Sequence, residues 1–332
     1  MLIIAFIVWG VLGVFLIGLM QLVSMQGWAT DSVHKHGIAE MQASRLGGAV
    51  CILGGFLVVI MLKLNGADES GGSGPFGIRR FVVVAIMGSM VLGLVEDIRN
   101  DSLSPRIRLG ILAILFGFIL WQWPALVPSS IGAPILDSLL SIPALAFLLC
   151  LVFCVGFLNA INMFDGINLQ ASTYSLILIT ILIFYLKFSL FLNILLIFIL
   201  CFKYLNFKNK TFLGDNGTLL ISFIFSFIFI KLYNENIIIH SDEIFIYMMV
   251  PGIDMIRLFF TRILMNRSPF SDDRIHIHHL LLDKFTYLQS LIIINSLILM
   301  PILLMKVNIN NLFSILLTIT LYTVIIIKIK KV

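Results

Sequence analysis

The segment of residues 266–284 reads NRSPFSDDRIHIHHLLLDK and holds half of the six histidines in the chain. His276, His278 and His279 stand within four residues of one another, shortly after Arg274. The chain is 60% hydrophobic and only 12% charged, so this concentration of ionisable groups indicates a functional site. Imidazole beside guanidinium suits the binding of phosphates, whereas three imidazoles by themselves also suit zinc. Because no cysteine is nearby and H-E-x-x-H spacing is absent, we favour phosphate binding and keep zinc as the alternative.

Carboxylates gather in two other segments, Glu96 and Asp97 in LGLVEDIRN and Asp215 in FLGDNG. Two or more carboxylates can hold a hard divalent cation, for which we expect Mg²⁺, with Mn²⁺ as the alternative ion. Water and substrate phosphates would complete the coordination, so the pattern indicates chemistry on a phosphorylated substrate. The structural alternatives are a solvated helix end for the acidic pair and a simple turn for Asp215. A functional role is favoured for the pair, because a helix C-terminus disfavours negative charge.

Asn159, Asn162 and Asp165 follow one another at three-residue spacing in NAINMFDGINLQ. This spacing places the two amides on one helical stripe, where they can donate to and accept from a base or a sugar. Hydrogen bonding between helices is the alternative, and the sequence leaves both open. Asp254 and Arg257 stand at i and i+3, which suits a buried ion pair as well as a substrate contact.

Long apolar runs provide the elements that must position these groups. The mean hydropathy of +1.09 and the bilayer-length runs predict an all-α polytopic membrane protein with about eleven transmembrane helices. No substantial soluble part interrupts them, so residues 1–332 are predicted to form a single transmembrane domain. The predicted spans lie near residues 2–24, 46–64, 81–95, 107–123, 139–160, 170–186, 189–207, 218–239, 243–264, 286–305 and 309–327.

The basic residues orient these spans. With the N-terminus outside, sixteen of the 22 Lys and Arg residues lie on the cytoplasmic side and six lie outside, as the positive-inside rule requires. The C-terminus and the polar motifs are then cytoplasmic. So is Arg45, which begins R-L-G-G at the start of the second span, where a helix N-terminus favours a phosphate. The net charge of +5 comes without a separate basic tail, so we expect no nucleic-acid partner.

Taken together, the motifs resemble the polyprenyl-phosphate N-acetylhexosamine-1-phosphate transferases, the MraY/WecA type of glycosyltransferase family 4. The resemblance rests on R-L-G-G from Arg45, the acidic pair with LSPRIRL after it, N-A-x-N-x-x-D-G from Asn159, FLGDNG from Phe212 and SPFSDDRIHIHHLL from Ser268. These motifs occur in the family's order and cover nearly the whole chain. The Ser-Pro-Phe-Ser and His-Ile-His-His sequences look more like the WecA-like branch, which starts O-antigen, common antigen or teichoic acid, than the peptidoglycan branch.

The resemblance implies transfer of a sugar 1-phosphate from UDP-GlcNAc or a related UDP-N-acetylhexosamine to undecaprenyl phosphate, with release of UMP. It also implies Mg²⁺ and a multi-pass location in the bacterial inner membrane. A homodimer is expected only because homodimers are the commonest assemblies. The residues that the resemblance assigns are Asp215 and Asp97 as metal ligands, Asp97 also beside the lipid phosphate, Glu96 in the place of a proposed base, Asn159, Asn162 and Asp165 at the nucleotide, and His278, His279 and Arg274 at the diphosphate. From their place in the predicted cytoplasmic loops, His276 and Arg45 are expected as further substrate contacts.

Two departures from the family pattern stand out. Glu96 replaces the first aspartate of the family's acidic pair, and Asn168-Leu169-Gln170 stands where the family commonly has Asp-Gly-Leu. They leave open the identity of the base and the contacts just beyond Asp165. Direct transfer and a double displacement through an aspartyl-phosphate are both compatible with the motifs. The alternative functions are an ion-coupled transporter and an inactive relative that acts as a scaffold.

Overall fold

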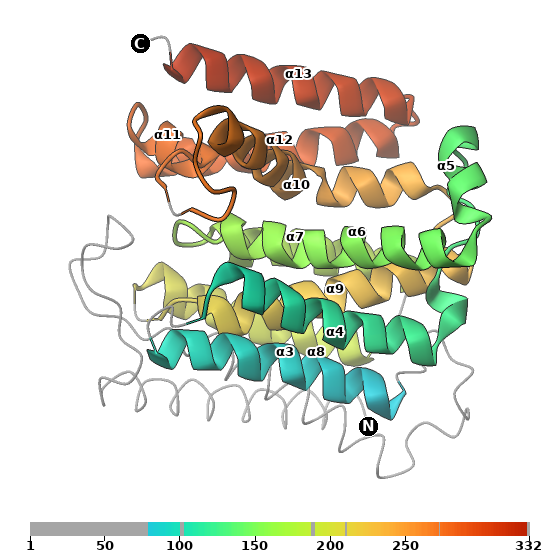
Figure 1. Ribbon diagram of the computed structural model, residues 1–332. Coiled ribbons are helices and arrows are strands. Elements are labelled where there is room, and N and C mark those ends of the chain that lie inside the picture. The colour runs from blue at the N-terminus through green and yellow to red at the C-terminus, as the bar shows by residue number, and fades with distance from the viewer. Residues whose placement is uncertain (1–78, 100–102, 187–189, 210, 272, 331–332) are drawn as a thin grey trace. The chain divides into compact units, whose positions relative to one another are not determined.

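A computed structural model shows a protein built of helices (Figure 1). It describes residues 79–99, 103–186, 190–209, 211–271 and 273–330, and no β-strand occurs in these ranges. Seven helices in them are long and apolar enough to cross a membrane, as expected of a polytopic membrane protein. The spans predicted near 2–24 and 46–64 lie outside the described residues, and so does Arg45.

Each of the nine spans predicted within the described residues coincides with a helix. The seven candidate membrane-crossing helices are α3 (Arg80–Arg99), α4 (Pro105–Gln122), α6 (Pro143–Phe164), α9 (Gly214–Asn234), α10 (Ser241–Leu264), α12 (Tyr287–Lys306) and α13 (Asn311–Lys330). The other two are α7 (Gln170–Leu186) and α8 (Leu190–Phe207), and three short helices were not predicted, η1 (Pro124–Leu126), α5 (Pro134–Leu140) and α11 (Ile277–Leu282). The total of eleven spans and the orientation of the chain stay predictions.

Local sequence explains several of the helix ends. Pro143 stands in the first turn of α6, where proline is favoured because no N–H partner is needed. Thr286 and Gln289 form a reciprocal capping box at the start of α12. Asparagines in the left-handed backbone region follow four helices, at positions 209, 236, 266 and 308.

Leu169 is the exception among the described non-glycine residues with a positive φ, because the other four are asparagines. Its φ is 66°, a conformation that costs a residue with a branched side chain about 1 kcal/mol. The family that the motifs resemble commonly has Asp-Gly-x-Asp-Gly-Leu from the position of Asp165 onward, and Leu169 stands at the second glycine of that pattern. The backbone conformation therefore gives a physical reason for a glycine at this position.

Replacing Leu169 by glycine is expected to stabilise the protein by about 1 kcal/mol, because glycine adopts a positive φ without strain. Thermal unfolding of the purified protein in detergent would measure this. A matched control is Leu186→Gly at the end of α7, where the side chain is also half-buried but the backbone is helical. This control should lose stability. Equal losses in the two variants would contradict the assignment of strain to Leu169.

The described residues fall into two compact units. The first contains residues up to Ile119 together with Ala171–Phe225, and the second contains Leu120–Gln170 together with Ser226–Val332. The single transmembrane domain expected from the sequence stays a prediction.

Glycine and aromatic contacts hold the first unit together. A side chain at Gly88 of α3 would lie 3.0 Å from Leu115 of α4, so these two helices are closely packed. The rings of Phe116 in α4 and Phe223 in α9 have centroids 4.9 Å apart. In the second unit, α10 packs against α6, α12 and α13, and the short α11 packs against α12 and α13.

Candidate active site

Carboxylates of α3 and α9 meet one guanidinium of α4 in the first unit. Nη1 of Arg108 donates to Oε2 of Glu96 at 2.8 Å and to Oδ2 of Asp215 at 3.2 Å. Glu96 is only 2% exposed, whereas the Asp215 side chain is 24% exposed. We call Glu96, Asp97, Arg108 and Asp215 the carboxylate cluster. When its three carboxylates are ionised, one guanidinium leaves an excess of negative charge that would attract a cation.

Asp97 caps the start of α9 from the end of α3. Its Oδ1 accepts from the backbone N–H of Asp215 at 3.0 Å, and its Oδ2 accepts from the backbone N–H of Asn216 at 2.9 Å and from the Asn216 amide. The first N–H groups of a helix have no partner within it, and they carry the positive end of the helix dipole. The Asp97 carboxylate, 1% exposed, provides acceptors for these N–H groups and places negative charge at the positive end of the dipole. The alternative that Asp215 lies in a simple turn is wrong, because α9 begins at Gly214.

Gly93 permits this approach of α3 to α9. A Cβ at Gly93 would lie 2.5 Å from the Cα and the N of Asn216 and 2.5 Å from the carbonyl carbon of Asp215. Such distances are shorter than any that real Cβ atoms tolerate. Gly93 precedes Asp97 by one helical turn, so both residues face the start of α9.

The cluster offers two ligands that fit Mg²⁺. This ion is usually bound through one or two protein carboxylates, with water and substrate phosphates at the other positions. Within the described ranges, no group of three His, Cys, Asp or Glu residues is placed to hold a metal ion. Glu96 and Asp215 fit best, since they already share one cation and Oε1 of Glu96 is buried without a hydrogen-bond partner. Asp97 fits less well, because both its oxygens are occupied by α9.

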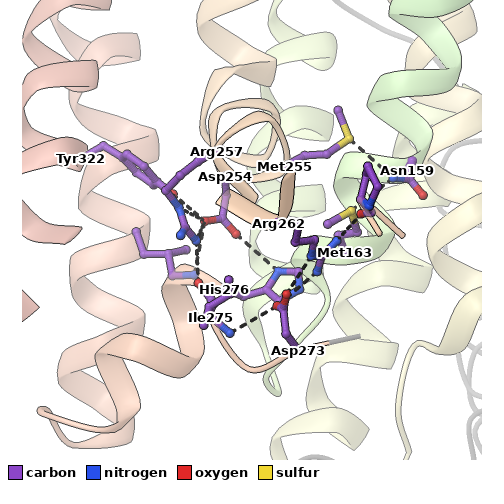
Figure 2. A network of polar contacts seen from close by, with 12 residues as sticks. Asn159, Met163, Asp254, Met255, Arg257, Arg262, Asp273, Ile275, His276 and Tyr322 are labelled. Atoms are coloured by element: carbon purple, nitrogen blue, oxygen red, sulfur yellow. Dashed lines mark hydrogen bonds and ion pairs between the residues drawn. The ribbon is translucent and has the colours of Figure 1, made fainter. Parts of the chain in front are cut away.

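The amide residues predicted for the nucleotide lie at the end of α6 in the second unit. Asn159 and Asn162 are one turn apart on α6, and Asp165 is the residue at which the helix ends. All three are half-buried. The Asn159 amide donates to the sulfur of Met163 at 3.2 Å and faces that of Met255 at 3.6 Å (Figure 2). Thioether sulfur is a weak acceptor, so Asn159 keeps most of its capacity for a polar ligand.

The three histidines of the sequence motif come together where α11 begins. The ring centroids of His276 and His278 are 5.2 Å apart, and those of His278 and His279 are 4.3 Å apart. Arg274 is exposed and His276 and His279 are half-buried, but His278 is 1% exposed. His278 is therefore the least accessible of the groups predicted at the diphosphate.

Arg262 anchors the loop that leads to these histidines. Its Nε and Nη2 donate to the carboxylate of Asp273 at 2.7 and 3.2 Å, and its Nη1 donates to the Pro269 carbonyl at 2.7 Å. Burial opposes ionisation of Asp273, but the hydrogen bonds and the charge of Arg262 outweigh it and lower the pKa of Asp273. This carboxylate thus stays ionised at neutral pH and keeps the loop tied to α10.

Gly166 and His278 are in direct contact within the second unit. A Cβ at Gly166 would lie 1.8 Å from Nε2 of His278, so the imidazole occupies the space that a side chain would need. The Asp-Gly sequence after Asn162 and the histidine motif are therefore packed against each other.

The structure thus divides the predicted residues between the two units. Glu96, Asp97 and Asp215 meet in the first, and the second brings together Gly166 with the histidines. Sequence reasoning missed Arg108 as the common partner of two carboxylates and Arg262 as the anchor of the loop. No short-range pattern signals either role, because each guanidinium serves residues from another segment.

Comparison with known proteins agrees with the resemblance of the motifs. Residues 80–233 match the family described as glycosyl transferase family 4. The phospho-N-acetylmuramoyl-pentapeptide-transferase of Clostridium perfringens is 21% identical over 230 residues, which cover 65% of this chain and 68% of that protein. A probable undecaprenyl-phosphate N-acetylglucosaminyl 1-phosphate transferase of Bacillus subtilis is 27% identical over 265 residues, which cover 76% of this chain and 70% of that protein. The undecaprenyl-phosphate alpha-N-acetylglucosaminyl 1-phosphate transferase of Escherichia coli is 28% identical over 225 residues, which cover 64% of this chain and 60% of that protein.

Proposed function

Because residues 80–233 match glycosyl transferase family 4 and the motifs resemble it, we propose that the protein transfers the sugar 1-phosphate of a UDP-N-acetylhexosamine to undecaprenyl phosphate and releases UMP. The observation that carries the proposal is the pair Glu96 and Asp215 around Arg108, which lies within the matched stretch. We place the reaction in the bacterial inner membrane, where its product would start a cell-surface glycan. A homodimer is the expected assembly.

The proposed chemistry is a direct phosphoryl transfer. An oxygen of the lipid phosphate attacks the β-phosphorus of the donor, and the bond from that phosphorus to the bridging oxygen breaks as UMP leaves. Mg²⁺, when held by Glu96 and Asp215, supplies the positive charge that a diphosphate needs in such a transfer. The lipid phosphate is already largely anionic at neutral pH, so Glu96 need not act as a strong base.

The other residues of the chain take supporting roles in this proposal. Asp97 holds the N-terminus of α9 and thereby positions Asp215. Arg274 and His279 present N–H donors for phosphate oxygens, which are strong acceptors, and His276 is a further contact with the UDP-sugar. Contacts with the nucleotide and the lipid phosphate are proposed for Asn159, Asn162, Asp165, His278 and Arg45.

Release of labelled UMP tests the function directly. The purified protein should release UMP only when a UDP-sugar, undecaprenyl phosphate and Mg²⁺ are all present. A panel of UDP-GlcNAc, UDP-GalNAc and UDP-N-acetylmuramoyl-pentapeptide would identify the donor, since relatives of both kinds match the chain. Failure to release UMP with any donor of the panel, or transport of an ion instead, would overturn the proposal. Exchange of UMP with the donor in the absence of lipid would favour the two-step route.

Replacing Gly166 by alanine is expected to lower UMP release on the order of tenfold, because the new Cβ must displace the His278 ring. Gly156→Ala is a matched control in α6, since its nearest neighbour, Met255, would be at an ordinary 3.9 Å. If the effect runs through His278, then Gly166→Ala should cost nothing further in a His278→Ala background. Additive losses in the double variant would contradict this.

A further inference from the structure

Asp254 is a buried carboxylate of α10 that neither the family motifs nor the carboxylate cluster accounts for. It is 3% exposed, and its Oδ1 accepts hydrogen bonds from three parts of the chain. These come from Nη2 of Arg257 at 2.7 Å, from the hydroxyl of Tyr322 on α13, and from the backbone N–H of Ile277 at 3.3 Å (Figure 2). A buried charge with this many donors is held in one position.

The second oxygen of Asp254 faces the histidine motif. Its Oδ2 lies 3.5 Å from Nδ1 of His276, the residue directly before α11. A carboxylate beside one ring nitrogen favours the proton on that nitrogen, which leaves the other nitrogen for a ligand. For His276 the nitrogen that is left is Nε2.

Arg257 and Tyr322 hold the backbone around the same histidine. Nη2 of Arg257 donates to the carbonyl of Ile275 at 2.7 Å, and its Nε donates to the Tyr322 hydroxyl at 2.7 Å. The N–H of Ile277 donates to Asp254. The peptide group before His276 and the peptide group after it are therefore both hydrogen-bonded to Asp254 or Arg257. The orientation of His276 is therefore set by α10 and α13 and not by its own short helix.

We infer that Asp254, Arg257 and Tyr322 are positioning residues that fix the orientation and the tautomer of His276, so that its unprotonated Nε2 is presented to the UDP-sugar as a hydrogen-bond acceptor for a hydroxyl or N–H group. This inference rests on the proposed function for its substrate. It assigns a role in the reaction to α13, which lies outside the stretch matched by the family.

Asp254→Asn tests the tautomer with the shape of the side chain retained. Donors of three residues point at the position of Oδ1, so the amide oxygen must stay there and the amide nitrogen must face His276. The N–H would then donate to Nδ1 and move the imidazole proton to Nε2. Nitrogen chemical shifts of ¹⁵N-histidine-labelled protein, with His276 assigned by its absence in His276→Gln, should show this exchange. We expect kcat to fall roughly 10- to 100-fold, while KM for the UDP-sugar changes less than about threefold.

Tyr322→Phe tests the contribution of α13 by removing one hydroxyl. It should lower kcat on the order of tenfold with little change in KM. Tyr233→Phe is the matched control, because its hydroxyl also donates one hydrogen bond, to the Ser130 carbonyl at 2.9 Å, but lies outside the network. An unchanged His276 spectrum in Asp254→Asn would overturn the inference. That spectrum is informative even if the wild-type protein releases no UMP, which would refute the proposed function alone.

Discussion

Replacing Asp215 by asparagine is expected to lower UMP release by about 10²- to 10³-fold. The substitution keeps the size of the side chain and the backbone N–H that Asp97 accepts, so α9 should begin where it does now. It removes the negative charge of the most exposed carboxylate in the cluster, the one best placed for an incoming cation. Mg²⁺ binds amide oxygen more weakly than carboxylate, so the loss should appear in both metal affinity and turnover.

Two measurements separate these effects. Titration with Mn²⁺, followed by its paramagnetic resonance signal, reports metal affinity without any turnover, and UMP release at saturating Mg²⁺ reports the chemistry. Asp283→Asn is a suitable control, because this carboxylate is exposed after α11 and does not belong to the carboxylate cluster. We expect Glu96→Gln to weaken Mn²⁺ binding as well, and Asp97→Asn to weaken it less. Full UMP release by Asp215→Asn would refute the metal assignment.

Replacing Gly93 by alanine is expected to destabilise the protein by about 3 kcal/mol and to abolish most of its activity. The added Cβ would lie 2.5 Å from three backbone atoms of Asp215 and Asn216, which cannot rotate away as a side chain can. Either α3 or α9 must move, and any such movement lengthens the hydrogen bonds that the first N–H groups of α9 donate to Asp97. A displacement of about 1 Å at Asp215 would by itself cost on the order of 10² in rate.

Gly110→Ala in α4 is the matched control, because a Cβ there would have no neighbour within 4 Å. It should leave activity unchanged and should slightly favour the helix. The yield of monodisperse protein, thermal unfolding in detergent and UMP release would be compared for the two variants. Normal stability and activity in Gly93→Ala would show that α3 and α9 do not need this backbone contact.

Much of the helical architecture is determined by the sequence itself. Spans such as 170–186 and 243–264 were predicted within two residues of α7 and α10, because a bilayer requires apolar runs of a certain length. The ion pair of Asp254 and Arg257 was one of two predicted alternatives, since residues three apart on a helix are neighbours. In the same way, the spacing of Asn159 and Asn162 placed both on one face of α6.

The partners of the site residues were decided only by the tertiary structure. FLGDNG looks like a turn in isolation, and it starts a helix here because Asp97, 118 positions before Asp215, accepts hydrogen bonds from the first N–H groups of that helix. Arg108 joins Glu96 to Asp215, and Tyr322 reaches Asp254 across 68 residues. Sequence periodicity reports which face of a helix is apolar. It does not report which distant donor will satisfy a buried carboxylate, because that depends on how the helices pack.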